Sequence, residues 1–363
     1  MRDPSIWRSR SKSLTTCTIR RRHGGIELRT VEVVPNVCWV GAVDWDTRTF
    51  HGAHHSTHFG TTYNAYLIVD ENVALVDTVL RPFAGEMLDR ISRLVDLSEI
   101  RYIIANHGEA DHSGSILEVL KHAPDATVVC TKRGKESLER QFHTSLKTKI
   151  VKTGDKISLG KYTLTFIEAP MLHWPDSMFT YLEEKALLMP NDAFGQHLAS
   201  SGRFDDEVDQ CLLMEEARKY YANILTPFSR LVERKLEEIQ KLGIKIDIIA
   251  PSHGVIWRSD PGKIIQAYSK WASGETELAA VVAYETMWGG TEAMARAIVD
   301  GLTAGGISTK MRRLSRSDRS DVISEMLEAR GVIVGSPTLN NGVSPQVAEL
   351  LSEIKGLKFG GRV

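Results

Sequence analysis

Asn106-His107-Gly108-Glu109-Ala110-Asp111-His112-Ser113-Gly114 places four side chains that can bind a metal ion within six positions, in the spacing H-x-E-x-D-H. The apolar run 102–105 before it is typical of a buried strand, and segment 115–120 after it has helical character. The four side chains therefore lie on a strand-to-helix loop, where a rigid scaffold can aim them at one point. Two imidazoles with two carboxylates suit a redox-capable transition metal better than a structural zinc ion, which usually takes thiolates. The alternative is a polar loop with only hydrogen-bonded side chains, but scattered polar residues rarely reproduce ligand spacing.

The length and composition of the chain set limits on its class. A chain of 363 residues suggests two domains, and an apolar fraction of 42% supports sizeable cores. A formal net charge of −1 gives no electrostatic case for a nucleic acid or a membrane as partner. No apolar run reaches the length of a membrane span, and no secretory signal is visible. The four cysteines, at positions 17, 38, 130 and 211, form no C-x-x-C pair. This spacing favours a reducing, cytoplasmic compartment, and it argues against a disulfide framework or a rubredoxin-type iron site.

Residues 1–29 differ from the rest of the chain in composition. They are rich in Arg and Ser, contain only Asp3 and Glu27 as acids, and show no sustained apolar period. This composition favours a disordered arm, or a start codon placed too early. The alternative is an organelle targeting peptide, against which Asp3 and the weak amphipathicity count.

A His or Asp follows directly after each of several predicted strands. The strands are 102–105, 162–168, 186–189 and 246–250, and the side chains after them are His107, His173, Asp192 and His253. A lone His after a strand is more often structural than a ligand. Strands that end along one rim of a sandwich can bring such side chains together, so the repeated pattern favours a metal site.

A second group of histidines lies in residues 51–58, which we predict to be a loop. His51, His54, His55 and His58 are candidates for another metal site, but their spacing is irregular. We therefore expect this loop to line the mouth of a pocket instead.

After a hinge at residues 273–275, the pattern changes to alternating strands and helices. Predicted strands at 278–284, 307–314 and 331–336, with a helix at 292–302, form a βαβαβ unit. The loop 286–291 opens that helix, and backbone N–H groups at a helix N-terminus make a phosphate cradle. Alone, this loop is a weak signal, because a plain strand-to-helix turn has the same composition.

The stretch 106–114 resembles the metal loop of the metallo-β-lactamase superfamily, whose hydrolases usually carry H-x-H-x-D-H. With Glu109 in place of the second His, it is similar to the flavodiiron proteins, or A-type flavoproteins, and the resemblance covers about residues 31–363. It implies an α/β chain with an αββα metallo-β-lactamase-like sandwich over 30–274, after the arm of 1–29. A partial flavodoxin-like doubly wound parallel sheet follows over 275–363.

The resemblance also implies the ligands of two iron ions. One iron would be held by His107, Glu109 and His173. The other would be held by Asp111, His112 and His253, and Asp192 would bridge the pair. A bridging carboxylate holds two cations at the short separation that two-metal chemistry needs.

The C-terminal part resembles a flavodoxin, which implies FMN as a cofactor. The flavin phosphate would contact Thr286, Met287, Trp288, Gly289, Gly290 and Thr291. The ring and ribityl side would contact Ser336, Pro337, Thr338, Leu339, Asn340, Asn341 and Gly342. Residues 358–363 look like the approach to a fourth strand, whereas a flavodoxin sheet has five in the order 2-1-3-4-5. We therefore expect a fragment or a truncated gene product, with an open edge at the third strand and one flavin-contacting loop missing.

The resemblance implies an oxidoreductase that reduces dioxygen to water, nitric oxide to nitrous oxide, or both. Electrons would reach the diiron centre through FMN from an external donor, namely rubredoxin, reduced deazaflavin or a flavin reductase. The assembly would be a head-to-tail homodimer or a dimer of dimers. The main alternative is a zinc-dependent hydrolase of the lactonase or thioesterase type, and another is a flavin electron carrier whose metal domain has lost its activity. Glu109 and the flavodoxin-like half argue against the first, and the intact ligand set argues against the second.

Overall fold

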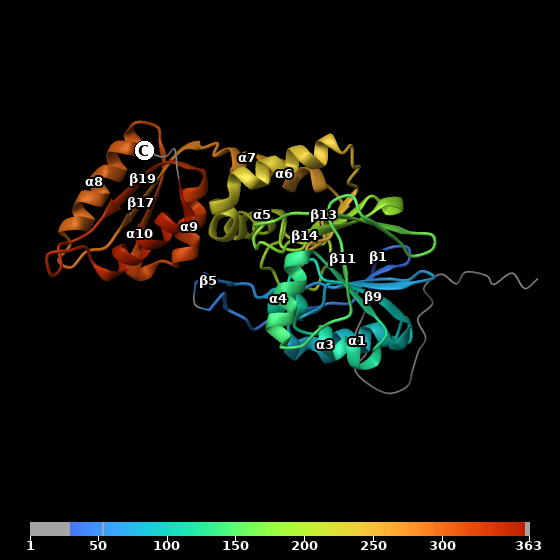
Figure 1. Cartoon of the computed structure of the whole chain (residues 1–363). Coiled ribbons are helices and arrows are strands. Elements are labelled where there is room, and N and C mark those ends of the chain that lie inside the picture. Colours follow the sequence, from blue (N-terminus) through green and yellow to red (C-terminus); the bar gives the residue numbers. More distant parts are fainter. Residues whose placement is uncertain (1–29, 53, 360–363) are drawn as a thin grey trace, which may run out of the picture.

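The computed structural model describes residues 30–52 and 54–359, which form a larger N-terminal lobe and a smaller C-terminal lobe (Figure 1). The predictions for the arm 1–29 and for most of the fourth strand at 358–363 fall outside these residues. Within them, no helix has the length and apolarity needed to cross a membrane.

The N-terminal lobe is built on two stacked sheets. The first has the order β1 (Val31–Val34), β2 (Val37–Trp39), β7 (Tyr66–Ile68), β8 (Val73–Val76), β9 (Ile100–Ile104), β10 (Thr127–Cys130) and β11 (Thr148–Ile150). The second has the order β12 (Lys156–Ser158), β13 (Thr163–Glu168), β14 (Met178–Leu182), β15 (Leu187–Met189) and β16 (Ile248–Ile249). Apolar side chains from both sheets, including Trp39, Tyr66 and Phe166, fill the layer between them. Their removal from water drives the stacking.

Helices cover the outer faces of both sheets. The first sheet is covered by α1 (Ala84–Ser92), α3 (Ile116–His122) and α4 (Lys132–Phe142), and the second by α5 (Gln210–Tyr220), α6 (Ser229–Lys241) and α7 (Pro261–Ser273). Met87 and Ile91 illustrate the reason, since their spacing puts both on the face of α1 that meets the first sheet. The result is an αββα sandwich, so the predicted fold class of this lobe is confirmed.

Short elements connect these layers. The turn α2 (Ala110–Ser113) lies in the metal loop, β3 (Ala42–Asp44) pairs with β6 (Thr61–Tyr63), and a π-helical turn spans Tyr221–Leu225. Single 3-10 turns are at Arg81–Phe83, Leu97–Glu99, Glu183–Lys185, Asp205–Glu207, Thr226–Phe228 and Leu314–Arg316. The predicted loop over 51–58 is wrong in part, because β4 (Thr49–Phe50) pairs with β5 (His55–Ser56) as a hairpin. Strands of two residues are too short to show a period of two in the sequence.

The C-terminal lobe is an open parallel sheet in the order β18 (Ser308–Arg313), β17 (Glu277–Tyr284) and β19 (Ala329–Gly335). The helices α8 (Gly290–Ala304), α9 (Arg319–Glu328) and α10 (Pro345–Leu357) alternate with the strands. The order corresponds to the first three strands of a flavodoxin, 2-1-3, which confirms the predicted class of this lobe.

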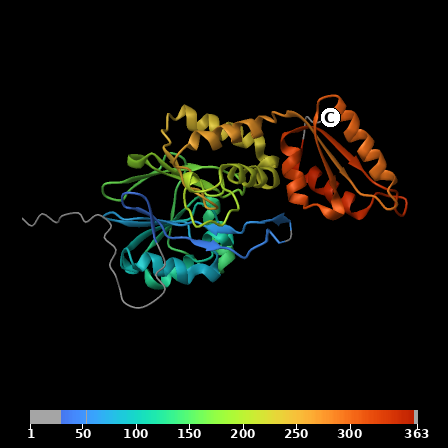
Figure 2. The same cartoon turned by 180° about the vertical axis from the view of Figure 1, so that it is seen from behind.

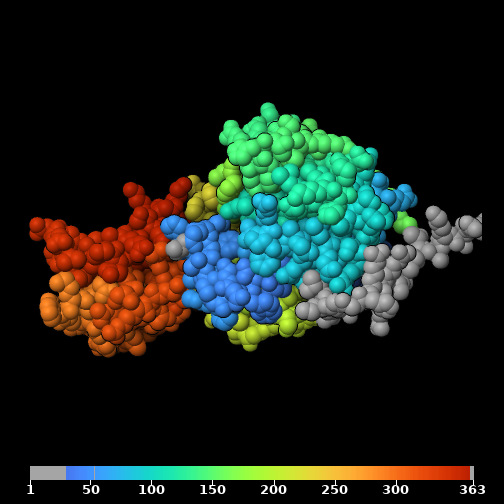
Figure 3. Space-filling view, turned by 90° about the horizontal axis from the view of Figure 1, so that it is seen from below, coloured from blue at the N-terminus to red at the C-terminus, as the bar shows by residue number. Residues whose placement is uncertain are grey.

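The two lobes pack against each other through α5 and α9. Leu213 and Ala217 of α5 belong to the same buried apolar cluster as Val322 and Met326 of α9. Seen from behind, α7 leads into the C-terminal lobe at the top of the molecule (Figure 2). Seen from below, the early N-terminal segment, in blue, lies against the orange and red C-terminal lobe (Figure 3).

Candidate metal centre

The predicted metal ligands converge where strands of the two sheets end. His107 follows β9, His173 follows β13, Asp192 follows β15, and His253 follows β16. His107, Asp192 and His253 are each 1% exposed, so the centre lies below the surface.

Asp192 lies between two groups of histidines. Its Oδ2 is 3.8 Å from Nε2 of His107 and 3.4 Å from Nε2 of His173. Its Oδ1 is 3.0 Å from Nε2 of His112 and 3.5 Å from Nε2 of His253. Each oxygen of this carboxylate therefore faces its own pair of imidazoles.

One further carboxylate completes each group. Oε2 of Glu109 is 3.2 Å from His107 Nε2 and 3.6 Å from His173 Nε2. Oδ2 of Asp111 is 3.2 Å from His112 Nε2 and 3.0 Å from His253 Nε2. The seven predicted ligands thus form two groups of three around Asp192, and all four imidazoles present Nε2 to the centre.

Several polar atoms of this cluster are buried without a hydrogen-bond partner among the described residues. They include Oδ1 of Asp111, Oδ2 of Asp192 and both ring nitrogens of His112. Each such atom costs about 1–3 kcal/mol if it stays unpaired. Although His112 Nε2 is near Asp192, it lacks hydrogen-bond geometry, as expected of two ligands aimed at a common point. Metal ions would use these lone pairs, and an imidazole and carboxylate donor set fits iron.

Opposed pKa shifts show how strongly the two kinds of side chain interact. Burial lowers the pKa of His112, but Asp111 and Asp192 outweigh it and raise the pKa to about 9. Burial raises the pKa of Asp192, but His112 and His173 outweigh it and hold the pKa well below its usual range. The clustered carboxylates therefore create a negative potential that favours positive charge at the centre.

Contacts outside the cluster fix the orientation of two imidazoles. Nδ1 of His107 lies 3.1 Å from Oδ1 of Asp176, and Oδ2 of Asp176 accepts from the Gly108 N–H at 2.7 Å. Nδ1 of His253 donates to the backbone oxygen of Thr62 at 2.6 Å. Both contacts leave Nε2 for a metal. Our sequence reasoning missed Asp176, although its position three residues after His173 was a usable signal. The contact of His253 with the backbone oxygen of Thr62 could not be predicted, because any residue type supplies such an oxygen.

A single buried carboxylate, Asp77, ties three ligand loops together. It accepts from the backbone and side-chain N–H groups of Asn106 at 2.9 and 3.0 Å, and from Nδ2 of Asn191 at 3.3 Å. Oγ of Ser252 lies 3.4 Å away. These three partners directly precede His107, Asp192 and His253 in the chain. Sequence reasoning missed Asp77, because its partners are 29 to 175 residues away.

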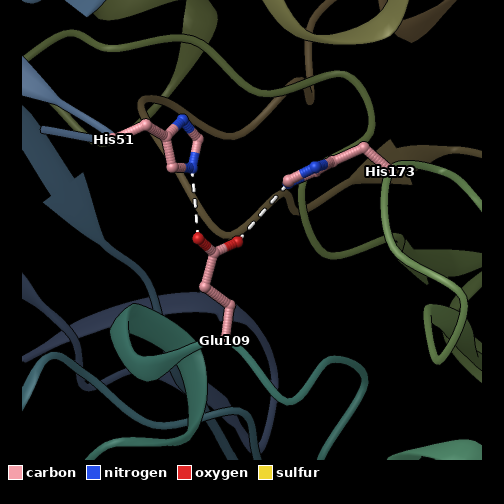
Figure 4. A group of neighbouring side chains, drawn as sticks. All are labelled: His51, Glu109 and His173. Atoms are coloured by element: carbon pink, nitrogen blue, oxygen red, sulfur yellow. Dashed lines mark ion pairs between the residues drawn. The ribbon is translucent and has the colours of Figure 1, made fainter. Parts of the chain in front are cut away.

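Two more side chains reach the cluster from elsewhere in the fold. Nε2 of His51 lies 3.2 Å from Oε1 of Glu109, and Figure 4 shows His51 and His173 both pointing at this carboxylate. The Tyr220 hydroxyl donates to Oδ1 of Asp192 at 3.0 Å. Two other histidines of the predicted loop 51–58 lie away from the cluster, since His58 pairs with Asp321 in the C-terminal lobe and the side chain of His54 is 74% exposed.

The predicted flavin loops lie at the carboxyl ends of the adjacent strands β17 and β19. In the first loop, the Gly289 N–H donates to Oγ1 of Thr286 at 3.0 Å, and Gly289 has a φ of 86° just before α8 begins. In the second, Leu339 and Gly342 exchange two backbone hydrogen bonds of 2.9 Å around a tight turn. A loop that ends at a helix N-terminus suits the phosphate of FMN.

Comparisons with known proteins agree with this geometry. The model of the ODP family beta lactamase matches residues 61–254, and that of flavodoxin matches residues 282–361. The chain is 56% identical over 334 residues to a nitric oxide reductase of Moorella thermoacetica, covering 92% of this chain and 84% of the relative. It is 42% identical to an anaerobic nitric oxide reductase flavorubredoxin of Salmonella arizonae, covering 91% and 70%.

Solved structures of the same architecture are similar over most of the chain. A rubredoxin oxygen:oxidoreductase of Desulfovibrio gigas matches with a TM-score of 0.90 at 36% identity, covering 92% of this chain and 84% of the other. The flavodiiron protein of Giardia intestinalis matches with a TM-score of 0.89 at 38% identity, covering 93% and 82%. These relatives confirm the predicted oxidoreductase class and do not favour the zinc hydrolase. The chain therefore belongs to the flavodiiron proteins, oxidoreductases that combine a non-haem diiron centre with FMN.

Proposed function

We propose that this protein reduces nitric oxide to nitrous oxide, dioxygen to water, or both. The observation that carries the proposal is the arrangement around Asp192, whose two oxygens face separate groups of histidines and acids. Two irons bound there supply the redox chemistry, and FMN supplies their electrons. The names of the relatives support both gases, since two are nitric oxide reductases and one structure is an oxygen oxidoreductase.

In this proposal the first iron would be held by His107, Glu109 and His173. The second would be held by Asp111, His112 and His253, and Asp192 would be shared by the two. The short distances within each group and the unpaired buried oxygens of Asp111 and Asp192 support the assignment. The bridging role predicts that neither position holds its metal properly without Asp192.

Other side chains of the centre orient the ligands and hold protons. Tyr220 places its O–H on Oδ1 of Asp192, which fixes the rotation of that carboxylate and keeps a proton within one hydrogen bond of the centre. Asp176 sets the direction of His107. Trp174, whose ring lies 5.0 Å from that of His107, shields one side from water.

We assign the FMN phosphate to Thr286, Met287, Trp288, Gly289, Gly290 and Thr291. The ring and ribityl side are assigned to Ser336, Pro337, Thr338, Leu339, Asn340, Asn341 and Gly342. The shared position of the two loops at the ends of neighbouring parallel strands supports this assignment.

We also propose a head-to-tail homodimer in which one chain's flavin loops face the partner's metal centre, with rubredoxin or another small reductant as electron donor. Exposed apolar side chains of the phosphate loop itself support such a contact, because Trp288 is 94% and Met287 53% exposed. Mixing His107→Ala chains with Gly289→Val chains tests it, since a mixed dimer contains one intact pair of sites. Verified mixed dimers without activity, or a fully active monomer, contradict it. We place the dimer in the cytoplasm, as the cysteine spacing predicts.

The decisive experiment is anaerobic turnover of each gas by purified, iron- and FMN-loaded protein, with metal analysis on the same sample. We expect about two irons per chain, in line with a two-metal site, and gas reduction driven by reduced donor. Zinc in place of iron, together with lactone or thioester hydrolysis, would overturn the proposal. Glu109→His sharpens the test, because it restores the ligand pattern of the hydrolases and should shift metal preference towards zinc.

A further inference from the structure

The hairpin β4–β5 connects the metal centre with the C-terminal lobe. His51 stands at its turn and reaches Glu109, whereas Ser56 on the returning strand meets α9. His51 has a φ of 50°, in the left-handed region that costs a residue with a side chain about 1 kcal/mol. Such a conformation persists only where surrounding contacts impose it.

His55 is the nearest of these contacts. Its Nδ1 lies 3.1 Å from Nδ1 of His51, and the two rings meet edge to face at 5.2 Å. Burial, reinforced by His51, lowers the pKa of His55 to about 3, so the ring is neutral and has one donor and one acceptor. The backbone of Asn223, in the π-helical turn, acts in the opposite direction to burial on the pKa of His55. One of the two facing Nδ1 atoms donates and the other accepts, and this bond joins the rings of His55 and His51.

Ser320, near the start of α9, holds the strand that carries His55. Its hydroxyl donates to the backbone oxygen of His54 at 3.2 Å and accepts from the Ser56 N–H at 3.2 Å, so it grips the hairpin on both sides of His55. Oγ of Ser56 donates to Asp318 at 2.7 Å and accepts from Lys219 at 2.8 Å. Ser320 is 3% exposed, so its hydroxyl has few competing water molecules.

Asn223 adds a further tie between the π-helical turn and α9. Its side-chain amide donates to the backbone oxygens of Lys219 at 2.8 Å and of Ser320 at 3.1 Å. Ser320 of α9 thus holds the backbone on both sides of His55, His55 contacts His51, and His51 reaches Glu109.

We propose that His55 is a positioning residue that holds His51 against Glu109, and that Ser320 makes this position depend on the docking of the flavin lobe. The proposal rests on the assignment of Glu109 as a metal ligand. It gives the contact between the two lobes of one chain a role at the metal centre, besides holding the lobes together.

The test is the EPR spectrum of the mixed-valent diiron centre in the full-length, iron- and FMN-loaded protein. His55→Phe keeps an aromatic ring but removes the hydrogen bond to His51, and Ser320→Ala removes both contacts of the hydroxyl to the hairpin. We expect His55→Phe to convert most of the signal to a shifted species, and Ser320→Ala to convert a smaller part to the same species. His55→Asn, whose side-chain oxygen can accept from His51, should restore the wild-type signal at least in part.

Two variants serve as matched controls. His54→Phe changes an exposed ring on the same hairpin, and Ser324→Ala removes a contact of α9 with Arg218 that does not touch the hairpin. Both should leave the spectrum unchanged. A wild-type spectrum in His55→Phe, or equal changes in Ser324→Ala and Ser320→Ala, would overturn the proposal.

Glu109→Gln separates this proposal from the ligand assignment. If Glu109→Gln leaves the spectrum unchanged, the ligand assignment itself fails. If Glu109→Gln changes the spectrum and His55→Phe does not, only the positioning role fails. Should His55→Phe lose its iron or fail to fold, Ser320→Ala decides. A shifted signal in Ser320→Ala that Ser324→Ala lacks supports the proposal, and a wild-type spectrum in Ser320→Ala contradicts it.

Discussion

The metal centre and the flavin loops differ in how deeply their residues are buried and in how many contacts hold them in place. The ligands His107, Asp192 and His253 are almost fully buried, and Asp77 braces the three loops that carry them. In the phosphate loop, by contrast, Trp288 is 94% exposed and the main internal contact runs from Gly289 to Thr286. A metal ion needs several side chains held at fixed positions before it arrives. A phosphate needs mainly the free N–H groups that every helix start supplies. Substitutions at the metal centre should therefore have the larger effects.

The largest effect is expected for Asp192→Ala. Without the shared carboxylate, the two cations repel each other unscreened and each loses one ligand, so iron content should fall from about two to one or fewer per chain. Metal analysis after gel filtration measures this, with Asp206→Ala, a surface carboxylate paired with Arg258, as control. Two irons and normal turnover in Asp192→Ala would show that the bridging assignment is wrong.

Asp77→Ala should come next. Asp77 is not among the proposed ligands, but its loss removes an acceptor from the buried backbone N–H of Asn106 and from the side-chain amides of Asn106 and Asn191. We expect the free energy of unfolding to fall by about 3 kcal/mol and iron to dissociate faster from both positions. Denaturant unfolding and iron release to a chelator measure the two effects. The exposed Asp46→Ala is the control. Lost stability with unchanged iron release would limit Asp77 to a role in folding.

Glu216, between the two lobes, predicts a pH dependence of stability. Burial raises its pKa from 4.5 to about 7; Lys219 opposes the rise, Asp321 adds to it, and His58 opposes it. The folded state therefore keeps a proton that the unfolded state loses between pH 4.5 and 7, so the free energy of unfolding decreases as pH rises through this range. Glu216→Gln lacks this dependence and should gain about 2 kcal/mol over wild type between pH 5 and pH 8. A stability difference that does not change with pH would contradict the prediction.

The smallest effect is expected in the phosphate loop. Gly289→Ala puts a side chain at a φ of 86°, which should cost about 1 kcal/mol, or about fivefold in FMN affinity. Gly301→Ala, in the middle of α8 with open space around its Cβ position, is the matched control and should not weaken FMN binding. Fluorescence titration of FMN measures both affinities, and iron content should stay unchanged. A loss of iron in Gly289→Ala would mean that the two regions are not independent.

The sequence alone determined the fold class and the side chains that meet at the metal centre. Strand β17 begins one residue before the predicted 278–284 and ends with it, and His107, His173, Asp192 and His253 each follow a strand as expected. These predictions succeeded because they depend on local patterns: a run of apolar residues forms a strand, and the residue after it lies at the rim. Which of these side chains bind iron, and which loop residues bind FMN, stay predictions.

Only the tertiary structure revealed the contacts that hold this site in place. Asp77 accepts hydrogen bonds from residues up to 175 positions away, and Ser320 hydrogen-bonds a hairpin more than 260 positions before it in the chain. The hairpin itself has strands of two residues, too short for any period to appear. Hydrogen bonds between distant segments depend on how the layers pack. The residues next to His55 or Asp77 in the sequence therefore do not indicate which distant residues will contact these side chains.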